Sequence, residues 1–233
     1  MISREALETV IREDLSGLWY TLDADDKRVV LENFTLHNFK RNQIIYAEKE
    51  TPEYLWCLIK GKVKKYKEGI GGRQQIIRLI CPIQYFGHRA FFANESYVSG
   101  AIAMEASVVG SIPMKVVSEL IDRNRQLAWF FIHELSHNLG RSDTKIVNLT
   151  QKHIRGRLAE ALALLIDNYG YEDDGETLNI YMSREDLANL SNMTTSNAIR
   201  TLSAFVNEHI IVVDGRRVKV LNEAMLRKIS KFG

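Results

Sequence analysis

Cysteine is scarce in this chain of 233 residues, which contains only Cys57 and Cys81. The two are far apart and form no C-x-x-C pair, so the spacing typical of zinc sites and iron–sulfur clusters is missing. We therefore expect no metal site and no Fe–S cluster. Both cysteines lie in apolar, strand-like stretches (LWCLI and LICPI), which predicts buried and unreactive thiols.

Long apolar runs and a large excess of one charge are also missing. No uncharged apolar stretch approaches the roughly 18–20 residues of a membrane-spanning helix, and the N-terminus lacks the apolar core of a signal peptide. The sequence therefore predicts a cytoplasmic protein without membrane contact. The formal net charge is +2, so charge by itself does not indicate a nucleic-acid-binding protein. Residues 183–233 carry a small basic excess, which is compatible with phosphate contacts.

The hydrophobic pattern changes period along the chain. Residues 1–34 have apolar side chains at helical spacing: Leu7, Val10, Ile11 and Leu15, then Val29, Val30 and Phe34. From about 35 to 112 the apolar residues alternate or form short runs, with strands expected at 42–46, 54–59, 62–67 and 74–80. Gly71-Gly72 is a strong hairpin signal. Short strands separated by glycine indicate a small β-barrel or jelly roll, and a β-rich domain that binds no ligand is the alternative.

Helical spacing returns from about residue 116 and continues to residue 153. Alternating steps of four and three form an a/d seam of Leu135, Leu139, Ser142, Ile146, Leu149 and His153. A second copy of the same helix is the simplest partner for this seam, which predicts a parallel coiled coil and a homodimer. Packing against the chain's own barrel is the alternative for the first turns, where Trp129, Phe130 and Phe131 are bulky.

Residues 183–205 have the pattern of two short helices joined by a tight turn. Ser183 and Asp186 form a capping box, and Asn192 suits the left-handed corner between the helices. Thr194 is expected to cap the second helix, with Ala198, Ile199, Leu202 and Phe205 pointing inward and Thr195, Ser196, Asn197 and Arg200 facing out. This is the layout of a helix-turn-helix, in which the second helix enters the major groove. An ordinary helical hairpin is the alternative.

The flanking segments turn this hairpin into a winged helix. A helix is predicted at 154–169, a short strand at 178–182, and two strands around Asp214-Gly215, which is a type I′ turn signal. Arg216 and Arg217 at the tip of this wing suit phosphate contacts.

The order of these parts resembles the Crp/Fnr family of bacterial transcription regulators over nearly the whole chain. In the β-rich part the resemblance rests on Leu55…Ile59-Lys60-Gly61-Lys62-Val63 and on Tyr85-Phe86-Gly87 before Phe91-Phe92. In the C-terminal part it rests on Ser183-Arg184-Glu185-Asp186-Leu187-Ala188, with Thr194 and Arg200. It implies an α+β fold: an N-terminal double-stranded β-helix (a jelly-roll, cyclic-nucleotide-binding-like barrel) at 1–122, a long dimerisation helix at 123–152, and a C-terminal winged helix-turn-helix at 153–233.

The implied function is that of a dimeric, sequence-specific regulator that binds palindromic double-stranded DNA and contacts RNA polymerase. An effector in the barrel would shift the dimer helix, whose contacts are expected at Leu135, Leu139, Ile146 and Leu149. The expected effector pocket comprises Gly87, His88, Arg89, Ser99, Ser142 and Asp143. No catalytic grouping of side chains stands out, so an enzyme is not expected.

Three departures from the family pattern argue against cyclic AMP as the effector. His88 follows Gly87 where the family's Glu takes the ribose hydroxyl, and Val98-Ser99 replaces the Arg-Ser pair that takes the cyclic phosphate. Ser142-Asp143 stands where cyclic-AMP binders have Thr-Ser, and an aspartate there would repel a phosphate. The family's four-cysteine oxygen sensors are excluded by the cysteine count. A haem-based NO or CO sensor with His88 as ligand, and a ligand-free regulator with a vestigial pocket, remain alternatives.

The expected DNA contacts follow from the second helix and the wing. Arg200 is the expected guanine reader, since its guanidinium can pair with O6 and N7. Ser196 and Asn197 are expected to make adjacent base contacts, because the family's Glu is missing here. Phosphate contacts are expected from Ser183, Arg184, Thr194 and the wing arginines, and Thr195 completes the set. A basic surface that binds DNA without sequence preference, and a barrel that regulates something other than DNA, are the remaining alternatives.

Overall fold

The computed structural model describes Thr9 and residues 16–233, and the chain divides into two compact units. One unit combines Met1–Gly72 with Ile77–Gly140, and the other combines Arg73–Ile76 with Arg141–Gly233. The helical face predicted at Leu7, Val10, Ile11 and Leu15 lies outside the described residues.

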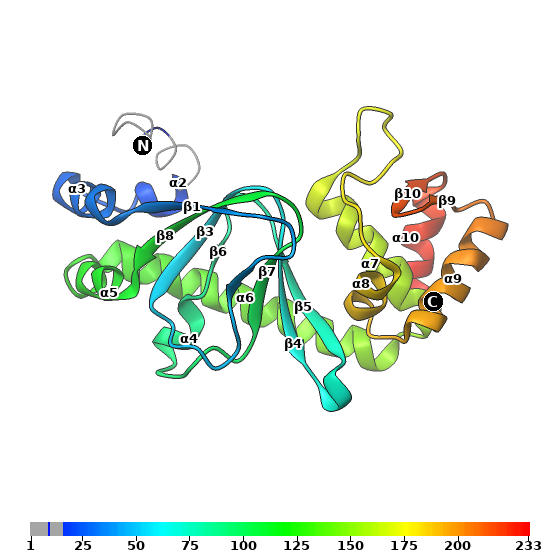
Figure 1. The fold of residues 1–233 in the computed structure, drawn as a ribbon, viewed down its shortest axis with the longest axis horizontal. Helices are drawn as coiled ribbons and strands as arrows, with labels where there is room; N and C mark the ends of the chain where they lie inside the picture. The colour runs from blue at the N-terminus through cyan, green and yellow to red at the C-terminus, as the bar shows by residue number, and fades with distance from the viewer. Residues whose placement is uncertain (1–8, 10–15) are drawn as a thin grey trace. The chain divides into compact units, whose positions relative to one another are not determined.

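The β-rich part folds into two four-stranded sheets in the orders β1-β8-β3-β6 and β2-β7-β4-β5 (Figure 1). The strands are β1 Thr35–Phe39, β2 Ile44–Tyr46, β3 Tyr54–Lys60, β4 Val63–Glu68, β5 Gln74–Ile80, β6 Tyr85–Phe86, β7 Gly100–Ala103 and β8 Ser107–Pro113. Neighbours such as β1 and β8, or β4 and β7, run antiparallel. The predicted jelly-roll barrel is therefore confirmed, and β4 and β5 pair around the predicted Gly71-Gly72 turn.

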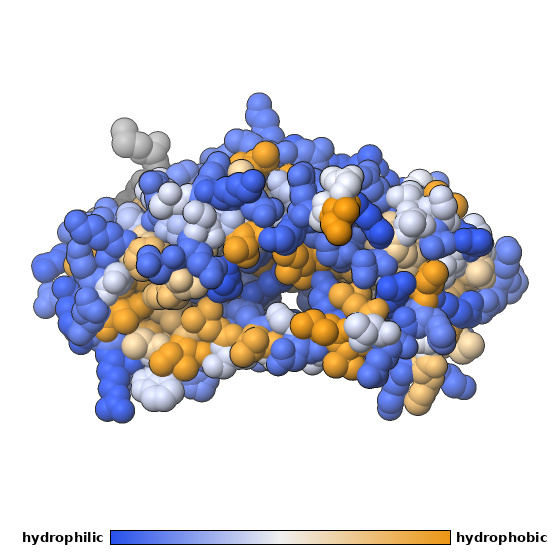
Figure 2. Space-filling view, turned by 90° about the horizontal axis from the view of Figure 1, so that it is seen from below, coloured by the Kyte–Doolittle hydropathy of each residue, from blue (hydrophilic) through white to orange (hydrophobic). Residues whose placement is uncertain are grey.

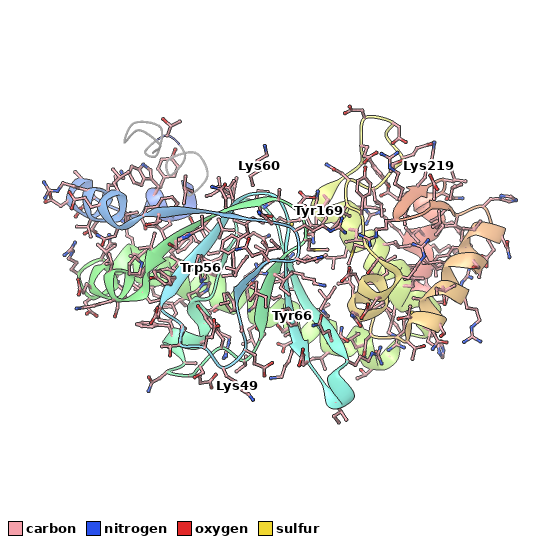
Figure 3. The ribbon with its side chains drawn as sticks, viewed as in Figure 1. Lys49, Trp56, Lys60, Tyr66, Tyr169 and Lys219 are labelled. Carbon is pink, nitrogen blue, oxygen red and sulfur yellow. The ribbon has the colours of Figure 1, made fainter. Side chains whose placement is uncertain are left out.

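Alternation along these strands builds the interior of the barrel. Trp56 on β3, labelled in Figure 3, belongs to a buried cluster with Leu58, Val63, Ile80 and Val109. Cys57 is buried as predicted, whereas Cys81 at the end of β5 is only half-buried. The short helix α4, His88–Phe92, follows β6 directly, and the sequence pattern had not indicated it.

Helices cover one side of the barrel, because their apolar side chains are buried against it. They are α2 Ser16–Trp19, α3 Ala24–Asn33 and α5 Met114–Arg123, followed by α6 Arg125–Gln151. Their buried residues Leu18, Val30, Leu120 and Phe131 belong to a second cluster, together with Phe34, which follows α3. The predicted continuous helical stretch from 116 to 153 is therefore broken at Asn124 and ends at Gln151, two residues before His153. Within the described part of the chain, no helix combines the length and hydropathy that a membrane crossing needs.

The C-terminal unit contains a helical hairpin followed by a wing. Its elements are α7 Ile154–Tyr169, α8 Arg184–Leu190, α9 Thr195–Asn207, β9 Ile211–Asp214, β10 Arg217–Val220 and α10 Glu223–Phe232. Strands β9 and β10 pair with Asp214 opposite Arg217, and Figure 3 labels Lys219 on this hairpin. The predicted helix at 154–169 and the predicted hairpin are confirmed.

Two local predictions in this unit are wrong. Residues 178–182 form no strand. Isolated bridges join Leu178 to Tyr171 and the preceding Thr177 to Lys219, but no ladder of consecutive bridges continues along the segment. The wing turn is not type I′, because Gly215 has φ +54° while Arg216 keeps a negative φ. A type I′ turn needs positive φ at both central residues.

A buried carboxylate fixes the break between α5 and α6. Asp26 on α3 is 3% exposed and accepts hydrogen bonds from Arg123 Nε (2.9 Å) and Asn124 Nδ2 (2.8 Å). Asn124 Nδ2 also lies 2.9 Å from the carbonyl oxygen of Thr21. Removal of the carboxylate would leave these donors without their acceptor in a partly buried place, which is costly.

We expect Asp26→Ala to lower the free energy of unfolding by about 2–4 kcal/mol, measured by urea denaturation. The value stays below that of a fully buried pair because the Arg123 side chain is 55% exposed. Asp25→Ala on the same helix is the control: Asp25 is 84% exposed in its pair with Arg28, so we expect a loss below about 1 kcal/mol. Equal losses in the two variants would contradict this account.

Candidate nucleic-acid interface and effector pocket

The turn between α8 and α9 has the geometry that its sequence predicts. Ser183 is the N-cap of α8, and its Oγ accepts a hydrogen bond from the backbone N–H of Asp186 at 2.9 Å. The same hydroxyl lies 2.8 Å from the Asp186 carboxylate and donates to it. Asn192, in the corner, has φ +50°, the left-handed conformation that asparagine tolerates. The N-cap at Ser183 and the left-handed corner are therefore confirmed, whereas the second bond of the capping box, from the Ser183 backbone N–H to the Asp186 carboxylate, stays a prediction.

Helix α9 presents one polar and one buried face. Thr194 caps it, since its Oγ1 accepts from the Asn197 N–H at 3.3 Å. Ala198, Leu202 and Phe205 are almost fully buried, as predicted. Thr195, Ser196 and Arg200 are exposed, and Asn197 is half-buried.

Ile199 was expected to point inward, and this prediction is wrong: its side chain is 48% exposed. A helix turns about 100° per residue, so Ile199 is rotated away from Ala198. It lies instead on the face of Thr195 and Ser196, three and four residues earlier. The outer face at the start of α9 therefore carries one large apolar side chain among its polar ones.

Asn197 and Arg200 are joined on this face. Arg200 Nη2 donates a hydrogen bond to Asn197 Oδ1, one turn earlier on the helix. The guanidinium is therefore held in a defined orientation on the exposed face before any partner is bound.

The remaining predicted DNA contacts lie at helix starts and on the wing. Ser183 and Arg184 are half-buried at the start of α8, whereas Arg216 and Arg217 are exposed. The guanidinium carbon of Arg217 lies 5.4 Å from the centre of the Tyr181 ring, and its Nη2 donates to Tyr181 Oη at 3.3 Å. Arg216, on the turn itself, extends the positive surface of the wing.

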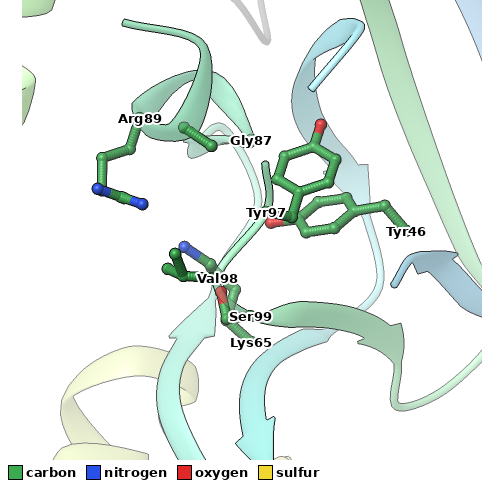
Figure 4. A pocket seen from close by; sticks show the side chains of 8 residues that line it. Tyr46, Lys65, Gly87, Arg89, Tyr97, Val98 and Ser99 are labelled. Carbon is green, nitrogen blue, oxygen red and sulfur yellow. The ribbon is translucent and has the colours of Figure 1, made fainter. Parts of the chain in front are cut away.

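A pocket in the barrel brings together residues from strands β2 and β4, from α4 and the glycine before it, and from the loop that precedes β7 (Figure 4). It has an empty volume of about 210 Å³, which includes space open to solvent. The residues that line it are Tyr46, Lys65, Gly87, Arg89, Ala90, Tyr97, Val98 and Ser99. Of the predicted pocket residues, Gly87, Arg89 and Ser99 are therefore present, and none of the eight is Asp or Glu.

His88 does not line this pocket. The ring is 3% exposed and packs against Phe92 and Phe131, with ring centres 6.1 and 5.5 Å apart. Burial, followed by the charges of Lys65 and Arg78, lowers the pKa of His88 to about 3, so the ring is neutral. A ring enclosed in this way does not face the pocket as a ligand for a haem iron. Across Thr9 and residues 16–233, no group of three His, Cys, Asp or Glu side chains gathers as metal ligands.

Ser142 and Asp143 are not among the lining residues either. Both are exposed on α6. Their proposed role toward an effector stays a prediction.

Positive charge dominates the pocket, although Arg89 was its only predicted cation. Burial, and then the charges of Arg78 and Arg89, lower the pKa of Lys65 to about 8. The inward position of Lys65 and Arg78 could have been predicted from the alternation of side chains along the strands. Lys65 follows buried Val63 by two residues, and Arg78 lies between buried Ile76 and Ile80. Side chains two apart on a strand share a face, so both cations occupy inward positions.

The outer part of α6 carries exposed apolar side chains at the predicted seam. Leu139 is 64% and Ile146 60% exposed, while Leu135 and Leu149 are half-buried. Of the aromatic residues in the first turns, Phe131 is buried in the barrel's helical cluster and Trp129 is 50% exposed. Figure 2 shows hydrophobic side chains gathered on the face of the barrel unit that it displays.

Comparison with known protein families assigns a domain type to both parts of the chain. Residues 36–124 match the family model of the cyclic nucleotide-binding domain, and residues 156–229 match that of the Crp-like helix-turn-helix domain.

Two curated relatives cover most of the chain at low identity. The CRP-like cAMP-activated global transcriptional regulator of Mycobacterium tuberculosis is 21% identical over 195 residues, 83% of this chain and 87% of the relative. The cyclic AMP receptor protein of Thermus thermophilus is 22% identical over 218 residues, 94% of this chain and 98% of the relative.

A solved structure shares the fold. FixK2 from Bradyrhizobium japonicum superimposes with a TM-score of 0.75 and 22% sequence identity, over 84% of this chain and 96% of that chain. A sensor-type barrel, a helix-turn-helix with a wing and two matching domain models in this order show that the chain belongs to the Crp/Fnr family of transcription regulators.

Proposed function

We propose that this DNA-binding regulator acts as a homodimer that reads a palindromic operator with α9 and responds to a barrel ligand other than cyclic AMP. The observation that carries the proposal is the outer face at the start of α9, where Thr195, Ser196, Ile199 and Arg200 are all exposed. Two such helices in a two-fold dimer would meet half-sites about one helical turn apart. The division into 1–122, 123–152 and 153–233, and a contact with RNA polymerase, belong to the same proposal.

Arg200 is the main base reader in this proposal. A guanidinium can donate two parallel hydrogen bonds to O6 and N7 of guanine, the commonest specific contact in the major groove. The bond from Arg200 to Asn197 supports this role, because it orients the guanidinium on the exposed face. Ser196 lies one turn from Arg200 and is placed for an adjacent base.

Ile199 adds a contact that the polar pattern had not indicated. An exposed apolar side chain on a recognition helix suits the C5-methyl group of thymine, which is the apolar feature of the major groove. The 48% exposure of Ile199 beside Arg200 supports a thymine next to the guanine.

Phosphate contacts would orient the helix on the duplex. The exposed wing arginines Arg216 and Arg217, together with Thr194 and Thr195 at the start of α9, lie outside the apolar core. Ser183 and Arg184 at the start of α8 offer backbone and side-chain donors. Such contacts fix the register of the protein and carry no sequence information directly.

The case for dimerisation rests on α6. An exposed helix that carries Leu139 and Ile146 with more than half of each side chain open to water is unfavourable unless a partner covers it. The a/d spacing of the seam suits an identical helix as that partner.

The case against cyclic AMP rests on the pocket. Two relatives are described as cAMP-activated or cyclic AMP receptor proteins. In this chain Val98 lines the pocket at the place of the phosphate-binding arginine, and His88 is buried away from it. The bidentate partner of a cyclic phosphate and the acceptor of the ribose hydroxyl are therefore both replaced.

We expect Arg200→Ala to weaken binding at the selected operator by about 1–3 kcal/mol and to relax one base position in each half-site. The test is selection of binding sites from random DNA, followed by fluorescence anisotropy. Arg216→Ala is the matched control: it should weaken all sequences uniformly and lower the salt dependence by about one phosphate contact. An unchanged selected site for Arg200→Ala would contradict the assignment.

Ile199 is tested with DNA that lacks the thymine methyl group. Replacement of thymine by uracil at one operator position should weaken binding of the unaltered protein several-fold and leave binding of Ile199→Ala unchanged. Arg200→Ala should keep the sensitivity to uracil, because its side chain reads a different base. A protein that never distinguishes thymine from uracil would refute this contact.

The dimer is tested by charges in the seam of α6. The double variant Leu139→Asp, Ile146→Asp should shift the protein from dimer to monomer at micromolar concentration in analytical ultracentrifugation, because two-fold symmetry places like charges opposite each other. Thr144→Asp, exposed on the same helix outside the seam, should stay dimeric. A monomeric unaltered protein, or a double variant that remains dimeric, would overturn the proposal.

A further inference from the structure

Two positively charged side chains occupy inward-facing strand positions of the barrel, which are usually apolar. Lys65 on β4 shares its inward face with Val63, which is fully buried. Arg78 on β5 lies between Ile76 and Ile80, both fully buried. Strands β4 and β5 are neighbours in one sheet, so these cations enter the barrel from adjacent strands. Lysine and arginine are rarely drawn inward without a compensating charge.

A third cation reaches the same place from α4. Arg89 lines the pocket together with Lys65, and Figure 4 shows their charged ends on one side of it, with Tyr46 and Tyr97 on the other. Arg89 lies at the mouth, where its Nη2 is 2.9 Å from the carboxylate of Glu95, which does not line the pocket. Arg78 donates to the neutral side chain of Gln84 at 3.3 Å.

The charges around Lys65 show no compensation within the described residues. Arg78 and Arg89 are the charged groups that act on it, and both lower its pKa. Burial and these like charges both disfavour the charged form of Lys65, and an anion beside it would offset them.

The remaining polar groups of the pocket are hydrogen-bond donors. The Tyr46 hydroxyl is buried, has no hydrogen-bond partner among the described residues and is directed toward the middle of the pocket (Figure 4). Burial, and then Tyr97, raises the pKa of Tyr46 above its usual range, so the hydroxyl keeps its proton. The buried Ser99 adds a second hydroxyl to the lining. A buried donor without an acceptor favours a ligand that brings one.

The size of the site limits the ligand. Sites for drug-sized ligands measure about 300–1,000 Å³. The empty space here is about 210 Å³ even with the part that is open to solvent, so the enclosed part is smaller still. The rings of Tyr46 and Tyr97 are stacked, with centres 3.8 Å apart, and fill one side of the pocket. A small ligand fits this space better than a base, a ribose and a phosphate together.

We propose that the barrel pocket binds a small, multiply charged oxyanion, a phosphate ester or a dicarboxylate, through Lys65, Arg89 and the Tyr46 hydroxyl, with Arg78 as a neighbouring positive charge that does not itself line the pocket. This inference rests on the proposed function, since it names the ligand class of the effector pocket. The anion supplies a counter-charge that the lining residues do not give Lys65, and it accepts a hydrogen bond from Tyr46.

The test is isothermal titration calorimetry of the full-length protein at constant ionic strength. The probes are inorganic pyrophosphate and succinate, with sodium chloride as the background salt and cyclic AMP as the nucleotide. We expect saturable binding of pyrophosphate or succinate, and the probe that binds more tightly identifies the phosphate or the dicarboxylate source. Cyclic AMP that binds more tightly than both would overturn the inference, as would the absence of binding by both probes.

Matched variants assign the site. Lys65→Met and Arg78→Met should each weaken the affinity for the anion roughly tenfold or more, because a positive charge near the anion is lost. Each should also unfold at a higher temperature than the unaltered protein without anion, which shows that the variant is folded. Lys64→Met, at the neighbouring position on the opposite face of β4, should bind the anion normally. Equal effects of Lys64→Met and Lys65→Met would refute the site.

Operator binding separates this inference from the proposed function. Anisotropy with operator DNA is measured with and without the anion. An anion that binds through Lys65 and leaves the affinity for DNA unchanged supports the oxyanion site and removes the effector role. DNA binding that proves sequence-specific in a protein that ignores both anions supports the regulator and overturns the oxyanion site.

Discussion

The burial of Lys65 beside the like charges of Arg78 and Arg89 is the interaction on which the proposed ligand site depends. These side chains come from β4, β5 and α4, and none of the eight pocket-lining residues is Asp or Glu. A barrel built only for stability would place apolar side chains at such inward positions, as it does at Val63, Ile76 and Ile80. Locally unfavourable groups on an otherwise consistent scaffold are typical of functional sites. The charge of the pocket therefore favours a ligand that balances it, and such a ligand is an anion.

The same arrangement bears on the proposal that the ligand of this cyclic nucleotide-binding domain is not cyclic AMP. Val98 removes the arginine that forms two parallel bonds with a cyclic phosphate, while Lys65 and Arg78 bring positive charge from the barrel wall. A lysine is a point charge and does not reproduce the planar fork of an arginine. In the proposed site, positive charge is present without the paired donors of that arginine, which favours a compact anion over a cyclic nucleotide.

The fold was largely predictable from the sequence, because its signals are periodic and local. The α7 limits, the N-cap at Ser183 and the left-handed Asn192 follow from hydrophobic spacing and the chemistry of single residues. The wrong predictions concern features that depend on contacts with residues distant in the sequence. Residues 178–182 have strand composition, but only single bridges reach them, and Ile199 has an apolar side chain on a face with no core behind it. Lys65 and Arg78 were missed because charged residues are usually expected to face outward, although the strand period placed both inward.

Contacts from the pocket to α6 suggest how the charge of a ligand would be felt outside the barrel. Gly87 and Arg89 line the pocket, and His88 between them packs its ring on Phe131 of α6 at 5.5 Å. Lys65 and Arg78 act electrostatically on the same ring and help to lower its pKa to about 3. An anion that neutralises these cations would change the electric field at His88, whose ring contacts the buried Phe131 of α6. Because α6 continues without interruption to Gln151, it passes from the barrel unit into the unit that carries α9. The exposed residues Leu139 and Ile146 lie on this same helix, so the proposed ligand site and the proposed dimer seam both involve α6.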